Sequence, residues 1–163
     1  MVHSVNFQDF VNRQNRDQWI KAAEKMIERM ISLVKAGAHS GLIATNTMHT
    51  AFDEVQKRSP MPLISIVDDT TEAIGKEGSK VVGILGTVFT MREIFYKDGL
   101  SKHGIKTPMP GTKDQLYVNR IICRELCRGE VSSKSRERFI EIVEELISRG
   151  AQEQLSHVQR YPF

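Results

Sequence analysis

The stretch that decides the fold is Gly-Leu-Ile-Ala-Thr-Asn-Thr-Met-His, residues 41–49. Residues 42–44 form a short apolar run after two glycines, which is the pattern of a buried parallel strand. Thr45, Asn46 and Thr47 follow at once, and Asn46 or Thr47 can cap the helix expected behind them. Side chains at such a turn stand at the carboxyl edge of a sheet, where a helix start favours an anion. The stretch therefore predicts a carboxylate-binding turn, with a plain helix cap as the simpler alternative.

Length and composition limit what this turn can belong to. With 163 residues and a hydrophobic fraction of 40%, the chain can form one full domain or two small ones. The net charge is +3, and no basic stripe is interleaved with aromatic residues, so we expect no nucleic-acid partner. No apolar run approaches the ~20 residues that span a bilayer, so we expect no membrane partner either. Two cysteines make no disulfide framework, and we expect a cytoplasmic protein.

The rest of the chain alternates apolar strands with amphipathic helices over short loops, which predicts an α/β fold with a parallel sheet. After residues 150–152 this rhythm calls for another buried strand. Residues 153–163 have little apolar content and no alternation, so we expect an aberrant tail there. The expected helices are residues 17–36, 47–59, 68–77, 89–103, 113–128 and 133–149, and the expected strands are 42–44, 62–67, 80–87, 105–107 and a strand end at 5–7.

A few further residues are candidates for chemistry. Gly86 and Thr87 end the strand expected at 80–87 and repeat the geometry of the Thr45 turn, so they can line the same crevice. Cys123 and Cys127 are four residues apart on one helix, but a metal would need two more ligands, and none has a suitable spacing. We therefore expect buried core cysteines and no metal site. His49 is the one histidine beside the candidate site, and we expect it at the surface or behind the residues that touch substrate.

The sequence contains six blocks, at residues 45–49, 62–66, 71–74, 83–87, 89–91 and 123–129. Together these blocks resemble the aspartate/glutamate racemase family. The resemblance covers residues 3–152 and implies two racemase-type α/β domains with parallel sheets around a cleft, each incomplete here. We place the first domain at residues 1–60, without its opening strand, and the second at residues 61–152. The resemblance also implies catalysis without pyridoxal phosphate, any other cofactor or a metal.

The resemblance also implies the chemistry of the site. In the family, two acid/base side chains, usually cysteines, flank the substrate α-carbon; one removes the α-proton and the other protonates the opposite face. The first of these positions is Thr45 here, whose hydroxyl is a poor base at neutral pH but can hand a proton to a carbanion. Asn46 and Thr47 match residues that hold the substrate carboxylate, and Arg128 stands where the family tends to place a cation near the cleft.

Two parts of the family pattern are missing from the sequence. The family opens with a glycine-rich strand and loop before residues 4–7, and it carries the second cysteine in a Gly-Cys-Thr-Glu block after residues 150–152. We therefore expect a chain truncated at both ends. We hypothesise that the tail is a frameshift, because codons can be chosen for residues 153–163 that, with one base added in front, encode a strand leading into Cys-Thr-Glu.

Two functions from different classes follow from the resemblance. The first is a cofactor-independent amino-acid racemase, an isomerase of aspartate or glutamate that works as a homodimer and is impaired because the second acid/base is absent. The alternative is a non-catalytic remnant that only dimerises or binds a carboxylate ligand. Hydantoin racemases, maleate isomerases and decarboxylases share the fold, but the Asn-Thr-Met-His block at residues 46–49 favours an amino acid.

Overall fold

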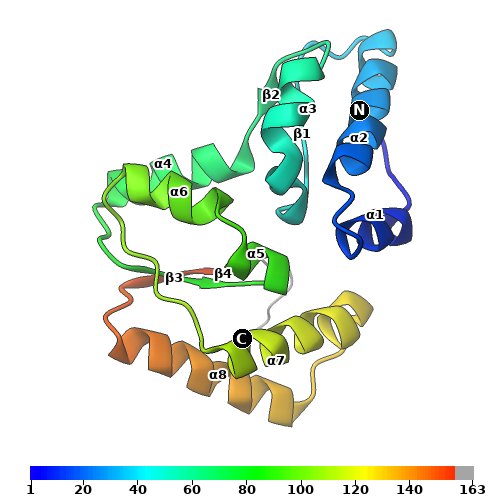
Figure 1. The fold of residues 1–163 in the computed structure, drawn as a ribbon. Helices are drawn as coiled ribbons and strands as arrows, with labels where there is room; N and C mark the ends of the chain where they lie inside the picture. The colour runs from blue at the N-terminus through cyan, green and yellow to red at the C-terminus, as the bar shows by residue number, and fades with distance from the viewer. Residues whose placement is uncertain (157–163) are drawn as a thin grey trace. The chain divides into compact units, whose positions relative to one another are not determined.

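The computed structural model describes residues 1–156, which form a mixed α/β structure with parallel strands (Figure 1). The described chain falls into two compact units, Met1–Asp69 and the part that begins at Thr70. Each unit contains one two-stranded parallel sheet. The expected α/β class with parallel strands is therefore confirmed. The division into domains at residue 60 stays a prediction, and the first compact unit of the structure continues to Asp69.

The first unit is built around one long helix. Its elements are α1 (Phe7–Gln14), α2 (Trp19–Lys35), β1 (Gly41–Leu42), the 3₁₀ helix η1 (Thr47–Ala51), α3 (Phe52–Arg58) and β2 (Leu63–Ile64). Helix α2 confirms the prediction for residues 17–36, and Gly37 follows it with a φ of 95°. The strand end expected at residues 5–7 is wrong, because Phe7 opens α1. There the Asn6 side chain accepts hydrogen bonds from the N–H groups of Gln8 and Asp9.

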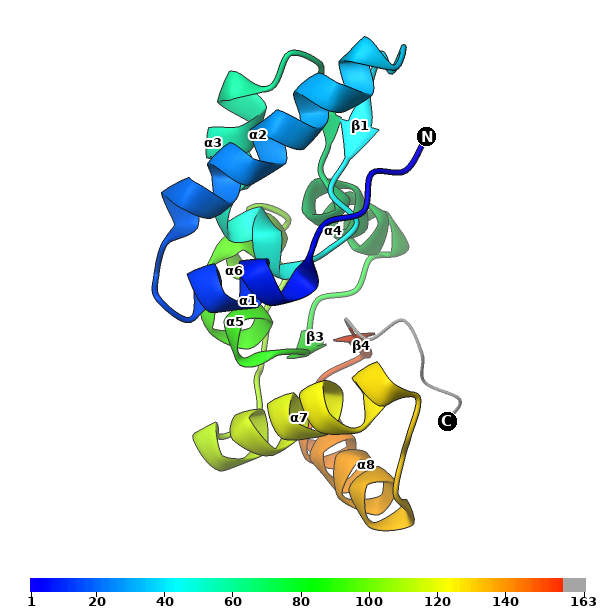
Figure 2. The same ribbon diagram turned by 90° about the vertical axis from the view of Figure 1, so that its right-hand side faces the viewer.

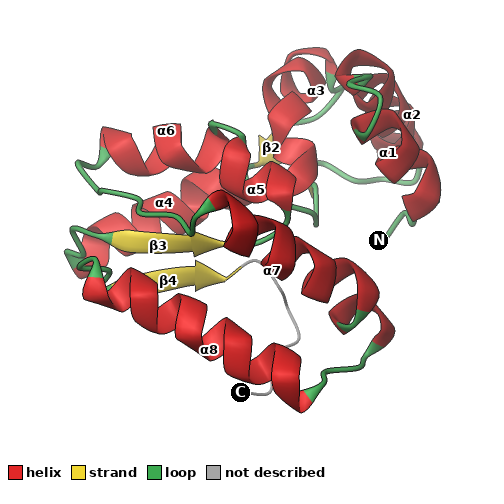
Figure 3. Cartoon of the chain, turned by 60° about the horizontal axis from the view of Figure 1, so that its bottom comes forward, coloured by secondary structure: helices red, strands yellow, loops and turns green. Residues whose placement is uncertain are grey.

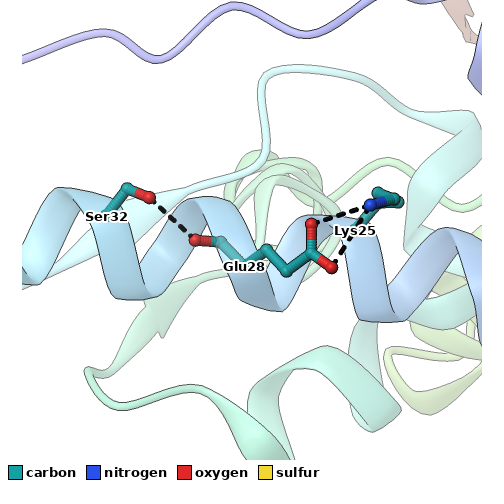
Figure 4. Close-up of polar contacts among 3 residues, drawn as sticks. All are labelled: Lys25, Glu28 and Ser32. Carbon is teal, nitrogen blue, oxygen red and sulfur yellow. Dashed lines mark hydrogen bonds and ion pairs between the residues drawn. The ribbon is translucent and has the colours of Figure 1, made fainter.

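Helix α2 has one apolar and one polar face, as its sequence period requires. Its apolar face packs on α3 and η1, and Figure 2 shows α2 lying beside α3. On the polar face, Lys25 Nζ lies 2.9 and 3.2 Å from the two carboxylate oxygens of Glu28, and the Ser32 hydroxyl donates to the Glu28 carbonyl at 3.0 Å (Figure 4). Burial of apolar side chains therefore holds the unit together. The core residues are Phe10, Ala22, Ala23, Met26, Ile27, Met30, Ile43, Met48, Ala51, Val55 and Met61.

The two strands of this unit are shorter than predicted. Strand β1 ends at Leu42, whose side chain is 52% exposed, whereas Ile43 is 1% exposed. Strand β2 ends at Ile64, and Ile66 already belongs to α4 (Ile66–Glu77). The Ser65 hydroxyl accepts the N–H of Asp68 at 3.1 Å, which is a helix cap and stops the strand. The apolar run at 62–67 therefore divides between a strand and a helix.

The second unit contains the remaining helices and a buried strand. After α4 come β3 (Val82–Leu85), α5 (Val88–Arg92), α6 (Phe95–Lys102), α7 (Thr112–Arg124), the 3₁₀ helix η2 (Leu126–Arg128), α8 (Ser133–Ser148) and β4 (Glu153–Ser156). The single helix predicted at 89–103 is wrong, because Glu93 takes an extended conformation and separates α5 from α6. Helix α8 confirms the prediction for residues 133–149.

Strand β3 is the centre of the second unit, and all four of its residues are buried. On one edge it pairs in parallel with β4. On the other edge, the Val82 N–H donates to the Lys106 carbonyl at 2.8 Å, so the short strand predicted at 105–107 is present as an isolated bridge between Val81 and Lys106. Helix α8 runs along one side of the β3–β4 pair (Figure 3), where Leu146 contacts Gly83.

The first four residues of the tail form the strand that the alternation of strands and helices calls for, which their sequence pattern did not predict. Glu153–Ser156 pairs with Val82–Leu85 residue by residue. The Gln152 side chain accepts the N–H groups of Lys80 and Val81 at 2.7 and 3.2 Å, and the Ser79 hydroxyl donates to the Glu153 carboxylate. Main-chain and side-chain hydrogen bonds therefore define this strand, without the apolar alternation that we required. The frameshift hypothesis for residues 153–163 stays a prediction, and residues 157–163 lie outside the described residues.

Within residues 1–156, no helix combines the length and the apolar character that crossing a membrane requires.

Candidate functional site

Thr45 stands at the carboxyl end of β1 and is exposed. Its N–H donates to the Ile43 carbonyl at 2.8 Å, so the chain turns tightly as it leaves the strand. The buried Ile43 side chain fixes the start of this turn in the core. A hydroxyl on a turn anchored in this way is both accessible and well positioned, which are requirements for an acid/base group.

The next two residues begin a 3₁₀ helix without the cap that we expected. Asn46 occupies the N-cap position of η1, but its backbone is already helical and its side chain makes no cap hydrogen bond. Thr47 is the first residue of the helix, and both side chains are half-buried. The cap interpretation is therefore wrong for Asn46. Residues 45–47 form a short turn, which we call the 45–47 turn.

His49 lies behind the 45–47 turn and is only 5% exposed. Its Nδ1 lies 2.9 Å from the Thr45 carbonyl oxygen, and its backbone N–H donates to the Asn46 carbonyl at 2.9 Å. The ring stacks on Phe52, with centroids 5.1 Å apart and planes within 4°. Burial lowers the pKa of His49 below its ordinary value of 6.5, while the hydrogen bond to Thr45 opposes this shift. The ring is therefore neutral at neutral pH. We did not predict the stacking, although a separation of three residues on a helical turn is a usable signal.

Gly86 and Thr87 have clear structural roles in the second unit. The Thr87 hydroxyl caps α5 by accepting the Thr90 N–H at 3.3 Å. A Cβ on Gly86 would lie 3.0 Å from Thr90 Cβ and Cγ2, so no larger residue fits without movement. Strand β3 ends at Leu85, so the prediction that Gly86 and Thr87 are the last residues of the strand is wrong, and both lie in the turn that follows it. A single crevice shared with the 45–47 turn stays a prediction, because each group of residues is described within its own unit.

The remaining candidates lie at the end of α7 and beyond it. Arg128 is exposed at the end of η2. Cys123 and Cys127 are both exposed, so the expectation of core cysteines is wrong. The apolar face of α7 is formed by Val118, Ile121 and Ile122, and Cys123 lies off that face. Partial burial and the neighbouring Cys127 raise the pKa of Cys123 above its ordinary value. Among residues 1–156, no group of three or more His, Cys, Asp or Glu side chains is placed to hold a metal ion.

The sequence matches a known protein family over most of its length. Residues 1–153 match the Asp/Glu/hydantoin racemase family over nearly the whole described chain. The chain belongs to the Asp/Glu/hydantoin racemase family. The resemblance of the Asn-Thr-Met-His block and of the blocks around β3 is therefore confirmed at the level of the family.

This racemase-family chain is also similar to individual proteins. It is 28% identical over 105 residues to the broad specificity amino-acid racemase RacX of Bacillus subtilis (strain 168), which covers 64% of this chain and 44% of that relative. It therefore spans less than half of the length of this curated relative.

Solved structures of the family superpose closely on the chain. A Yersinia pestis structure solved as a candidate Asp/Glu racemase has a TM-score of 0.87 at 35% identity and covers 96% of this chain and 69% of that one. An aspartate racemase homologue from Pyrococcus horikoshii OT3 has a TM-score of 0.79 at 32% identity, with 96% and 68% covered. A Picrophilus torridus aspartate racemase shares the fold. Its TM-score is 0.65 at 22% identity, and the match covers 77% of this chain and 52% of that one.

Proposed function

We propose that the chain carries out racemase-type proton transfer at the α-carbon of an acidic amino acid, without pyridoxal phosphate or another cofactor. The observation that carries the proposal is the exposed Thr45 at the carboxyl end of β1 in a chain of the racemase family. The similarity to RacX, whose name describes a racemase of amino acids, supports this class of substrate. Aspartate and glutamate are the substrates that we propose, because the family and its solved members carry those names.

Each site residue has a role in this proposal. Thr45 acts in both directions on one face: its side-chain oxygen, after losing its own proton to solvent, takes the α-proton, and the hydroxyl so formed exchanges with solvent and returns a proton to the α-carbanion. Asn46 and Thr47 hold the α-carboxylate. Gly86, Thr87 and Arg128 contribute the second side of the substrate site. The cysteine block that the resemblance places after residues 150–152 is absent from residues 153–156. We infer that an acid/base group faces only one side of the α-carbon. Exchange of the α-proton with solvent is therefore faster than racemisation.

The decisive experiment follows the α-proton of L-aspartate in heavy water by ¹H NMR, with chiral chromatography of the same samples. We expect slow loss of the α-proton signal with little D-aspartate. Thr45→Val keeps the shape and removes the hydroxyl, and it should slow exchange by about 10²-fold or more, since acid/base groups contribute roughly 10²–10⁴ in rate. Thr45→Ser is the matched control and should retain most of the exchange. Rapid interconversion of both enantiomers contradicts the one-sided mechanism.

Threonine at the position of the family's first cysteine favours a second candidate, carboxylate binding without turnover. A ligand that binds only the folded state raises the melting temperature. Aspartate that raises the melting temperature of the wild type and of Thr45→Val equally, with no α-proton exchange in either, supports the binding function. Aspartate that changes neither quantity contradicts both candidates.

A further inference from the structure

The contacts of the His49 ring define its tautomer. Nδ1 lies 2.9 Å from the Thr45 carbonyl oxygen, which can only accept a hydrogen bond. Nδ1 therefore carries the hydrogen and donates to the backbone of the residue that we assign to acid/base chemistry. The His49 ring stacks on Phe52 with the two planes within 4° of parallel. This stacking fixes the orientation of the imidazole plane and therefore the direction of its Nδ1–H bond.

The other nitrogen of the His49 ring, Nε2, differs from Nδ1 in its hydrogen bonding. Nε2 is buried and has no hydrogen-bond partner among the described residues. A neutral ring tolerates this arrangement at the cost of one unsatisfied acceptor. An imidazolium would bury a charge and an N–H donor without an acceptor, which costs considerably more. The charge of Asp68, in the first turn of α4, opposes the lowering of the His49 pKa by burial but does not outweigh it. The pocket therefore selects the neutral Nδ1–H form, the one form that donates to Thr45 and leaves Nε2 without a proton.

We propose that His49 is a positioning residue for Thr45: its Nδ1–H holds the Thr45 carbonyl and so fixes the backbone from which the Thr45 hydroxyl projects. This inference rests on the proposed function in so far as Thr45 is the acid/base group. A buried aromatic ring of ordinary packing would need neither the donor nor the orientation. Because His49 also donates its backbone N–H to the Asn46 carbonyl, one residue binds the backbone at both Thr45 and Asn46.

Two substitutions of His49, by side chains that are isosteric with each other, distinguish a role in positioning Thr45 from a role in packing. In His49→Asn the amide nitrogen is attached at the same distance in bonds from the backbone as Nδ1, so it can still donate to the Thr45 carbonyl. His49→Leu has the same branching without a donor. Both variants lose the stacking on Phe52, so the difference between them reports the donor. A buried leucine is at least as favourable for stability as a buried asparagine, so a packing role predicts that His49→Leu is the better variant.

We expect the reverse order in activity. His49→Asn should retain α-proton exchange within about tenfold of the wild type, and His49→Leu should lose about 10²-fold, mainly in kcat rather than in KM, because small displacements of a catalytic group have effects of that size. Melting temperatures of both variants are measured alongside. His49→Leu exchanging as fast as His49→Asn, at equal or higher melting temperature, overturns the proposal.

A second readout keeps this inference separate from the proposed function. ¹⁵N NMR of the imidazole in the wild-type protein at neutral pH should show a protonated Nδ1 and an unprotonated Nε2. The amide signals of Asn46 and Thr47 should stay near their wild-type positions in His49→Asn and move in His49→Leu. A protonated Nε2 with a bare Nδ1 overturns the inference even if exchange is observed. The expected NMR result without aspartate exchange supports the positioning of the turn and rejects the proposed chemistry.

Discussion

Single residues decide how closely α8 approaches β3. A Cβ on Gly83 would lie 3.2 Å from Leu146 Cδ1 and 3.6 Å from Leu146 Cβ, and Leu146 is only 1% exposed. Gly83→Ala therefore forces a displacement in a closely packed core. We expect the free energy of unfolding to fall by about 1–3 kcal/mol, the usual cost of an extra methyl group in such a place. Urea denaturation followed by far-UV circular dichroism measures this change.

A double-mutant cycle shows whether the contact with Leu146 is the cause. Leu146→Val shortens the side chain that meets the new methyl group and should cost about 1 kcal/mol alone, as expected for one buried methylene. The double variant Gly83→Ala/Leu146→Val should then be more stable than the sum of the two single effects predicts. Additive effects would show that Gly83 is needed for another reason.

At the scale of elements, β4 depends on hydrogen bonds from the residue that precedes it. Gln152 Oε1 accepts the N–H groups of Lys80 and Val81, and the Gln152 N–H donates to the Val81 carbonyl at 2.9 Å. Gln152→Ala removes the two side-chain bonds and should lower the free energy of unfolding by about 1–3 kcal/mol, at roughly 0.5–1.5 kcal/mol per bond. Amide hydrogen exchange of Lys80 and Val81 should become faster. Gln154→Ala, on the exposed side of the same strand, is the control and should leave both amides unchanged.

The junction of α7 and α8 should be sensitive to acid. The pKa of Glu125 lies below its ordinary value of 4.5, because its carboxylate accepts the Ser132 N–H at 3.1 Å and the Ser135 hydroxyl at 2.7 Å. A carboxyl group whose pKa is lowered by folding stabilises the protein above its unfolded pKa. This stabilisation is lost as the pH falls through the folded value. Glu125→Gln should therefore melt below the wild type at pH 7, and the difference should close as the pH falls below about 4.

The exposed Glu130 provides the comparison for this junction. Glu130→Gln changes the same charge a few residues further along the chain, without removing the bonds to Ser132 and Ser135. Its melting temperature should follow that of the wild type at every pH. A gap between Glu125→Gln and the wild type that stays constant from pH 7 to pH 3 would show that the carboxylate form is not what matters.

Helical elements could be predicted from the sequence where their period was strong, as in α2 and α8, because burial of one face fixes that period. Strand lengths could not, since the apolar run at 62–67 contains both a strand and a helix start set by the Ser65 hydroxyl. Strand β4 was missed for the opposite reason: hydrogen bonds of Gln152 and the main chain hold it, and these leave no apolar pattern. In the site, the position of Thr45 at a strand end was predictable. The donor role of His49 depends on ring orientation, which sequence spacing does not encode.

At the scale of the whole molecule, each of the two units has its own core. The first is centred on α2 and the second on β3. Units with separate cores often unfold separately, and a single unfolding free energy then describes neither of them. The chain contains one tryptophan, Trp19, at the start of α2, so its fluorescence reports the first unit alone, whereas circular dichroism reports both.

Two substitutions, one in each core, test this separation. Met30→Ala, at a side chain that is 3% exposed, should destabilise the first unit by about 2–5 kcal/mol and lower the urea midpoint seen by Trp19 fluorescence. Gly83→Ala should lower a circular dichroism transition and leave the Trp19 midpoint unchanged. If both substitutions shift both signals together, the chain unfolds as one cooperative body. The free energy needed to unfold the 45–47 turn would then include contributions from β3 and α8 as well as from the core of the first unit.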